Sequence, residues 1–116
     1  DLCTSPHHYT YNLYKWFPLN QDNYRRYLNA NGMVEQLQIL QEILRGNIRS
    51  FAKGVDWWIE DEIEVRLLQE FQRKWVTHKR TKLLAFDLQF STNVFLPEFI
   101  GLGKAGGRGF GTVRRG

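Results

Sequence analysis

One apolar stripe in the middle of the chain constrains the fold more than any other feature. Its members recur at steps of three and four residues, the spacing of one face of an α-helix. They are Met33, Leu37, Leu40, Leu44, Ile48 and Phe51. The stripe predicts one long helix over residues 33–53, with Gly54 just past its end. A shorter helix, capped by the side chain of Asn20, is predicted to precede it over residues 20–28.

Strands are predicted where apolar and polar residues alternate along the chain. They cover residues 9–19, 63–76, 84–90 and 94–96, with a short last strand at 112–113. Residues 1–10 are expected to be an irregular leading segment, and residues 73–82 a basic turn between strands. The order strand, helix, strand, strand, loop or short helix, strand predicts an α+β domain of the ferredoxin-like (RRM-like) βαββαβ type.

A glycine-rich stretch lies near the end of the chain, where six of the 10 glycines fall between Gly101 and Gly111. It contains a literal G-x-G-x-x-G, but a dinucleotide fingerprint needs an acidic residue further on, and none follows it. A P-loop is excluded too, because the chain has no Gly-Lys-Ser/Thr triplet. Leu102 and Phe110 inside the stretch favour a loop packed on the core. Free glycine N–H groups in such a loop can bind an anion.

The charge of the chain is concentrated in the same region. The net charge is +4, yet residues 1–72 carry seven Lys/Arg and ten Asp/Glu, whereas residues 73–116 carry nine and two. A local excess of this kind is typical of a surface that binds a polyanion. The predicted binding residues are Lys79, Arg80, Lys82, Gly101, Gly103, Lys104, Gly106, Gly107, Arg108, Gly109, Gly111, Arg114 and Arg115.

Four segments resemble a known family. Asn93-Val-Phe-Leu-Pro-Glu-Phe-Ile-Gly-Leu-Gly-Lys104 and Gly107-Arg-Gly-Phe-Gly-Thr-Val113 resemble the C-terminal signature of the CRISPR-associated RAMP proteins. The segments at 16–20 with Tyr24, and at 44–53, are similar to the C-terminal half of the b-type branch of endoribonucleases that cut CRISPR repeat RNA. The resemblance covers most of the chain, and the glycine-rich stretch is its specific part.

The resemblance implies two ferredoxin-like domains in tandem, of which residues 1–116 would be the second, the first preceding Asp1. It implies that the glycine-rich stretch lies against repeat RNA. Cleavage would need neither metal nor cofactor: a ribose 2′-oxygen attacks the adjacent phosphate, leaving a cyclic phosphate and a free 5′-hydroxyl. This chain alone is expected to be inactive. Subunits of a CRISPR effector complex and a second copy of the chain are further partners that the resemblance allows.

The catalytic residue is not identified by this resemblance. A histidine is the usual acid or base in such chemistry, and His7, His8 and His78 are weak candidates, because none matches the motif of the family. Two alternatives stay open: a non-catalytic RAMP subunit that coats guide RNA, and a protein-interaction domain with a basic tail. No apolar run is long enough to cross a membrane, and a cytoplasmic location is expected.

Overall fold

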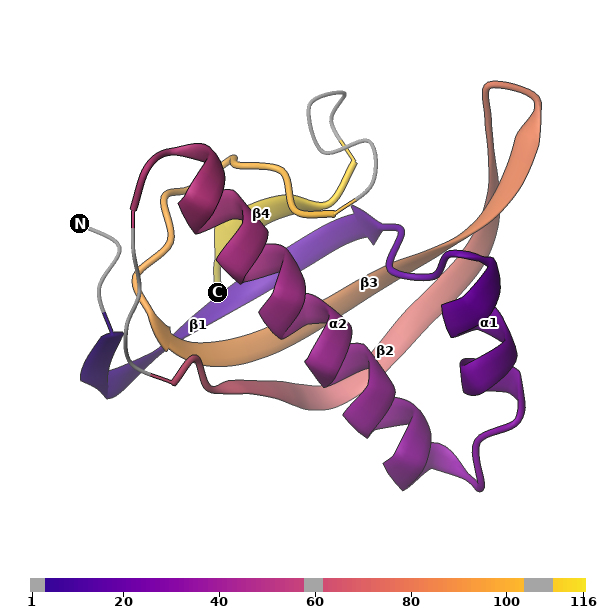
Figure 1. Ribbon diagram of the computed structural model, residues 1–116, viewed down its shortest axis with the longest axis horizontal. Coiled ribbons are helices and arrows are strands. Elements are labelled where there is room, and N and C mark those ends of the chain that lie inside the picture. Colours follow the sequence, from indigo (N-terminus) through magenta and orange to yellow (C-terminus); the bar gives the residue numbers. More distant parts are fainter. Residues whose placement is uncertain (1–3, 58–61, 104–109) are drawn as a thin grey trace.

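The computed structural model describes residues 4–57, 62–103 and 110–116. Its elements are β1 (Thr4–Trp16), α1 (Gln21–Leu28), α2 (Met33–Gly54), β2 (Val65–His78), β3 (Thr81–Val94) and β4 (Thr112–Arg115). The strands form one antiparallel sheet in the order β2-β3-β1-β4. Both helices lie against one face of this sheet and connect β1 to β2 across β3 (Figure 1). The predicted α+β, ferredoxin-like class is therefore confirmed.

Three predicted segment boundaries are wrong. The leading segment is not irregular, because β1 begins at Thr4, which pairs with Val94 at the far end of β3. The basic turn is much shorter than residues 73–82: β2 continues to His78, and only Lys79 and Arg80 lie outside the two strands. The strand predicted at 94–96 is not a separate strand: β3 runs unbroken to Val94, and Phe95 and Leu96 lie beyond its end. In each case pairing with a neighbouring strand decides the conformation where the local pattern is weak.

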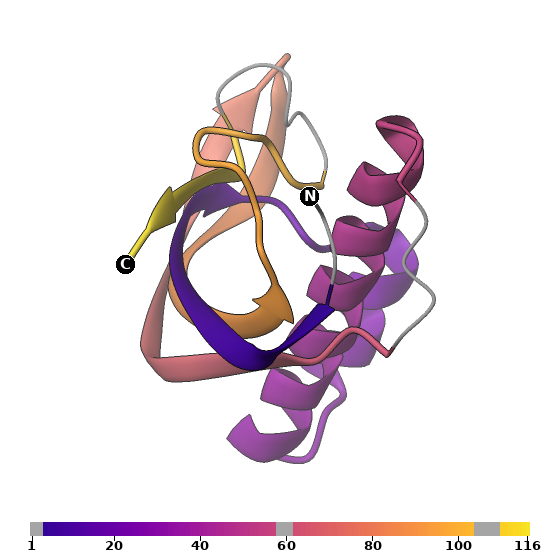
Figure 2. The ribbon, with the colours of Figure 1, turned by 90° about the vertical axis from the view of Figure 1, so that its left-hand side faces the viewer.

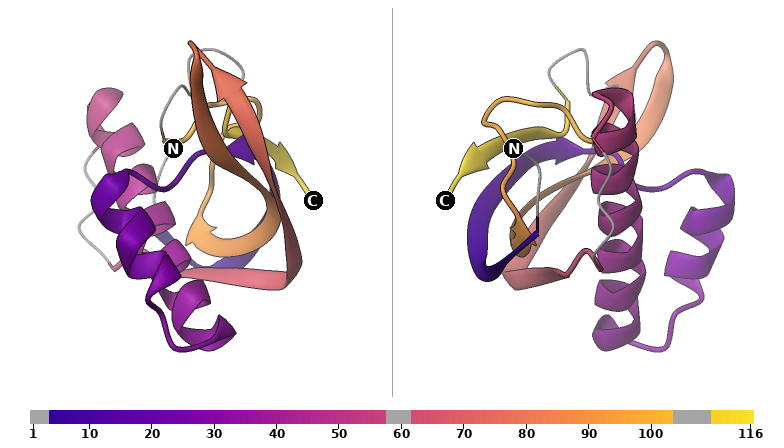
Figure 3. Two further views of the ribbon diagram at one scale, coloured as in Figure 1. Left: turned by 90° about the vertical axis from the view of Figure 1, so that its right-hand side faces the viewer. Right: turned by 60° about the vertical axis from the view of Figure 1, so that its left-hand side comes forward.

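The stripe of α2 supplies the helical half of the core. Ile39, Leu40, Leu44, Ile48 and Ala52 are buried there. All of them except Ile39 belong to one apolar cluster with the inward-facing residues of the strongly curled sheet (Figure 2). The first member of the predicted stripe, Met33, is 63% exposed. In the views of Figure 3, this end of α2 reaches beyond the curled sheet. Neither described helix is both long and apolar enough to span a membrane.

Two buried polar side chains fix the segments that enter β2 and leave β3. The hydroxyl of Tyr11 accepts a hydrogen bond of 2.7 Å from the backbone N–H of Leu96. Burial raises the pKa of Tyr11 above its ordinary value, although the hydrogen bond from Leu96 opposes this shift. The side chain of Asn93 accepts from the N–H of Glu64 and donates to the carbonyl of Glu62. The chain after β3 is thus held against β1 before it reaches the glycine-rich stretch.

Candidate nucleic-acid interface

Most of the described binding residues predicted from the sequence lie at one end of the sheet, where strands begin and end. This end is called the sheet edge below. Because neighbouring strands in the order β2-β3-β1-β4 are antiparallel, the ends of β1 and β2 meet the starts of β3 and β4 at this edge. The last β1–β3 pair is Trp16 with Phe86. Beyond it only β2 and β3 continue, paired from Arg73–Phe86 to His78–Thr81. They form a two-stranded ribbon that projects from the domain, as Figure 1 shows.

The tip of this ribbon is a two-residue turn made by Lys79 and Arg80. Both have positive φ, 49° and 67°. A two-residue turn with positive φ at both positions is a type I′ turn, for which Asn-Gly is the preferred sequence. The left-handed conformation costs a non-glycine residue roughly 1–2 kcal/mol. Lys79 and Arg80 both adopt this unfavourable conformation, and both have an exposed cationic side chain.

The rest of the ribbon is basic as well. Between Phe71 and Phe86 the sequence contains five Lys/Arg and no Asp or Glu. Lys74 and Lys82 are exposed. Arg73 is held in place by a hydrogen bond of 2.6 Å to the hydroxyl of Tyr27 on α1, whose ring it also covers. The ribbon therefore carries a positive potential along its length and leaves most of its cations open to solvent.

The described ends of the glycine-rich stretch are anchored at the same edge. Gly101 pairs with Thr112, and the N–H of Leu102 donates to the carbonyl of Gly111 at 2.9 Å. The N–H of Gly111 in turn donates to the carbonyl of Lys15 in β1 at 2.9 Å. Leu102 is fully buried, and the ring of Phe110 packs on that of Phe17 at 4.9 Å between centroids. The predicted packing of this stretch on the core is confirmed at both ends.

Two glycines of this stretch have no room for a side chain. Gly111 has a φ of +66°, and a Cβ there would overlap the carbonyl oxygen of Leu102. Gly103 has a φ of +79°, and a Cβ there would lie 2.8 Å from Oδ1 of Asn47 and 3.0 Å from Nε1 of Trp16. Close approach of two chain segments, together with positive φ, thus accounts for glycine at both positions.

Asn47 also contributes to this edge, although it is not among the residues predicted from the sequence. It lies on α2, and its Oδ1 accepts a hydrogen bond of 2.8 Å from Nε1 of Trp16. The pair forms the surface against which Gly103 packs. The available signal was its position, a polar residue next to Ile48 at the margin of the apolar stripe. A partner 31 residues away in the sequence cannot be identified from spacing alone.

Arg114 and Arg115 are placed differently from the other predicted cations. They lie in β4, which runs away from the edge that holds the ribbon. The guanidinium of Arg114 covers the ring of Phe99 at 5.4 Å, and that of Arg115 covers Phe95 at 5.1 Å and lies 3.9 Å from Glu98. The structure therefore separates these two arginines from Lys79, Arg80 and Lys82. The remaining predicted residues, Lys104, Gly106, Gly107, Arg108 and Gly109, lie outside the described part of the chain.

The three candidate histidines are also separated. His7 and His8 belong to the beginning of β1, at the opposite end of the strand from Trp16. Nε2 of His8 lies 3.6 Å from the carboxylate of Glu64, beside a pocket of about 500 Å³. His78 lies in β2 directly before the Lys79–Arg80 turn, so its backbone is at the ribbon tip. The side chains of His7 and His78 lie outside what the structure describes.

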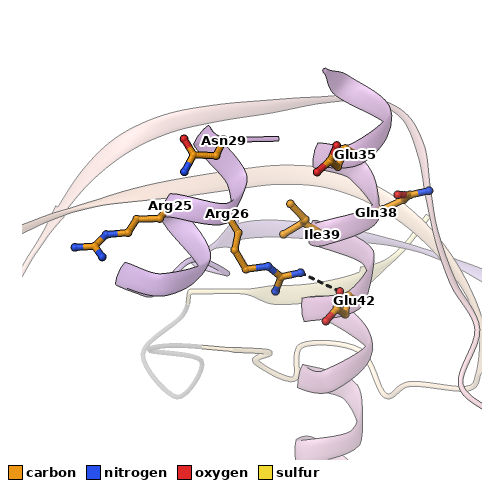
Figure 4. A pocket seen from close by; sticks show the side chains of 7 residues that line it. All are labelled: Arg25, Arg26, Asn29, Glu35, Gln38, Ile39 and Glu42. Atoms are coloured by element: carbon orange, nitrogen blue, oxygen red, sulfur yellow. Dashed lines mark hydrogen bonds and ion pairs between the residues drawn. The ribbon is translucent and has the colours of Figure 1, made fainter. Parts of the chain in front are cut away.

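A pocket of about 450 Å³ between the two helices differs from this edge in the charge of its lining. Figure 4 shows Arg25 and Arg26 of α1 on one side of it and Glu35 and Glu42 of α2 on the other. Arg26 and Glu42 form an exposed ion pair at 3.3 Å. The opposite charges compensate each other across the pocket. It therefore lacks the uncompensated positive charge that a polyanion requires.

Comparison with known proteins agrees with this architecture. The chain is 35% identical over 102 residues to an uncharacterized protein of Methanocaldococcus jannaschii, covering 86% of this chain and 67% of that protein. It is similar to a crystal structure of Cas6b, with 27% identity and a TM-score of 0.90, over 100% of this chain and 67% of that one. It is also similar to a crystal structure named as the CRISPR RNA processing endoribonuclease Cas6b, with 28% identity and a TM-score of 0.88.

The second of these structures is the longer one. The match covers 97% of this chain and 57% of that chain. A family model for the Cas6b C-terminal domain matches residues 3–116. The chain belongs to the Cas6b C-terminal domain family.

Proposed function

We propose that this chain is the RNA-binding part of an endoribonuclease that cleaves CRISPR repeat RNA into mature guide RNAs. The observation that carries the proposal is the basic β2–β3 ribbon, with Lys79 and Arg80 at its tip, at the same sheet edge as the anchored glycine-rich stretch. The family match and the name of the similar endoribonuclease support the choice of RNA and of the reaction.

The edge suits a structured RNA because its cations are spread over a projecting element. RNA helices are recognised mainly through phosphate, 2′-hydroxyl and shape contacts. In this proposal Lys79, Arg80 and Lys82 contact phosphate oxygens, and the glycine-rich stretch approaches the RNA with its backbone. The rigid anchoring of Leu102 and Gly111 holds that stretch against the domain, so that binding does not have to order its ends.

The proposed cleavage is an internal transfer that needs no metal. The ribose 2′-oxygen loses its proton to a base and forms a bond to the adjacent phosphorus, and the bond from phosphorus to the 5′-oxygen breaks. An acid protonates the leaving oxygen, which gives a 2′,3′-cyclic phosphate and a 5′-hydroxyl. Cations beside the phosphate stabilise the charge that develops on it. In this proposal the acid and base come mainly from a domain preceding residue 1, which makes the present chain inactive alone.

Two measurements test the proposal. Repeat RNA is titrated at several salt concentrations with the unmodified protein, with Lys79→Gln/Arg80→Gln, and with the matched control Arg25→Gln/Arg26→Gln. We expect weaker binding and a smaller salt dependence for the ribbon variant only, because each lost phosphate contact lowers the log–log slope by roughly 0.7–0.9. Equal affinities for the three proteins would overturn the proposed surface.

Cleavage is then followed in EDTA with the protein that includes the preceding domain. Products ending in a cyclic phosphate are expected to form at the rate seen with magnesium. Binding without cleavage under both conditions would instead support a subunit that coats guide RNA. Loss of cleavage in EDTA alone would contradict the metal-free reaction.

A further inference from the structure

A partly apolar cleft lies beside the basic ribbon, and of its lining residues only Lys82 has a role in the function proposed above. It has a volume of about 380 Å³ and opens between the start of α1 and the face of the ribbon that carries Trp75. Its lining includes Leu19, Asn20, Tyr24, Trp75, Lys82 and Leu84. The volume and the mixture of aromatic, aliphatic and few polar groups are typical of a site for a small flat ligand.

Trp75 is the most conspicuous member of this cleft. Its side chain is 56% exposed, whereas that of Trp16 is fully buried. Tyr24 of α1 contacts the Trp75 ring edge to face, with 6.1 Å between centroids and an angle of 74° between planes. Leu84 pairs with Trp75 across the ribbon. The indole is thus positioned by a neighbour on each side and keeps a large part of its surface open to solvent.

The surroundings of Trp75 indicate the charge of the ligand. Thr77 pairs with Lys82, so Lys82 lies on the same face of the ribbon as Trp75 and Leu84. No acidic residue occurs between Phe71 and Phe86 to neutralise it. An open aromatic surface beside a cation, on a ribbon without acidic residues, matches a nucleotide, which carries a flat base and an adjacent phosphate.

The cleft is continuous with the proposed RNA-binding edge. Residues 17–20 connect β1 to α1: Phe17 packs on Phe110 of the glycine-rich stretch, while Leu19 and Asn20 line the cleft. The opposite side of the cleft is the ribbon itself. An RNA held by the ribbon tip and the glycine-rich stretch would therefore pass this opening.

We infer that the cleft binds one unpaired base of the RNA, stacked on Trp75, with a neighbouring phosphate beside Lys82. The inference rests on the proposed function and adds to it a single-stranded nucleotide as the ligand of this cleft. Bases within a duplex already stack on their neighbours and are not available to an aromatic side chain, so the site selects single-stranded RNA. Tyr24 acts as a positioning residue, because it orients the indole.

The test compares two RNAs, a single-stranded oligouridylate and a fully paired duplex of the same length. Affinity is measured over a range of salt for the unmodified chain, Trp75→Ala, Trp75→Phe, and the control Trp57→Ala, which removes another partly exposed tryptophan. For the single strand we expect Trp75→Ala to weaken binding roughly 5- to 100-fold. Trp75→Phe should retain most of the affinity, and Trp57→Ala should bind as the unmodified chain does.

The salt dependence separates this inference from the proposed function. Trp75→Ala should shift the plot of log Kd against log salt without changing its slope, because stacking releases no counterions. Its affinity for the duplex should be unchanged. Unaltered single-strand affinity in Trp75→Ala, with a loss in Lys79→Gln/Arg80→Gln, would overturn the stacking site and leave the RNA-binding edge intact. Failure of every protein to bind either RNA would overturn both.

Discussion

Oδ1 of Asn47, in the second half of α2, lies 2.8 Å from Nε1 of Trp16 at the end of β1 and accepts its hydrogen bond. This contact ties the long helix to the strand that carries the carbonyl partner of Gly111. It also forms the surface on which Gly103 rests. The helix therefore supports the glycine-rich stretch through one side chain.

The first prediction concerns that side chain. Asn47→Ala leaves the indole N–H of Trp16 without its protein partner, and we expect it to lower the free energy of unfolding by roughly 1–3 kcal/mol. The better helix propensity of alanine offsets part of this loss. Urea unfolding measures the change, with Ser50→Ala on the exposed side of α2 as the control. A variant as stable as the unmodified chain would show that the contact contributes nothing.

The second prediction uses two glycines in opposite environments. Gly111→Ala places a Cβ against the carbonyl of Leu102 at positive φ, and should lower the free energy of unfolding by roughly 2–4 kcal/mol. Gly46→Ala is the matched control, since Gly46 lies within α2 and a Cβ there meets no atom within 4 Å. It should stabilise the domain by up to about 1 kcal/mol. In thermal unfolding, the melting temperature should therefore fall for Gly111→Ala and rise for Gly46→Ala, relative to the unmodified chain.

The third prediction is that one change at the ribbon tip raises the stability of the domain and weakens its binding to RNA. Lys79→Asn together with Arg80→Gly introduces the preferred type I′ sequence, and should raise the free energy of unfolding by about 1 kcal/mol or more. The same change removes two cations, so affinity for repeat RNA should fall. Its salt slope should decrease by about 1.4–1.8. A variant that becomes more stable and binds RNA unchanged would show that these cations have no role in binding.

The fourth prediction concerns alkaline pH. In the unfolded chain Tyr11 ionises near its ordinary pKa of about 10, whereas burial raises its pKa in the folded domain. Between these two values the unfolded state binds fewer protons, so the free energy of unfolding falls as the pH rises.

The variant Tyr11→Phe isolates this contribution. It should be less stable at neutral pH by roughly 1–3 kcal/mol, because the buried N–H of Leu96 loses its acceptor. Its stability should then decline less steeply above pH 10. The free energy of unfolding is measured in urea at a series of pH values for both proteins. If it declined equally steeply with pH in the two, ionisation of Tyr11 would not contribute to the loss of stability.

These examples indicate which features a sequence of this kind can predict. The long helix and the alternating part of the strands follow from apolar spacing, which is strong over 33–53 and 84–90. The predicted ribbon is too short because Lys79-Arg80 contains none of the usual turn residues, so the sequence does not distinguish these two residues from the rest of the basic run at 73–82. Contacts between distant partners, such as Asn47 with Trp16 or Trp75 with Tyr24, cannot be identified from the local spacing of residues.

The pairing of β4 with β1 has a consequence for folding during synthesis. Tyr14 pairs with Thr112 and Tyr11 with Arg115, so β1, an inner strand of the sheet, gains its second neighbour only after residues 112–115 have been synthesised. Contacts of such high sequence separation form slowly, because a long loop must close first. The sheet edge that we propose binds RNA is therefore completed late, after residues 112–115 have been synthesised. A nascent or truncated chain would expose the unpaired side of β1 and be prone to aggregation.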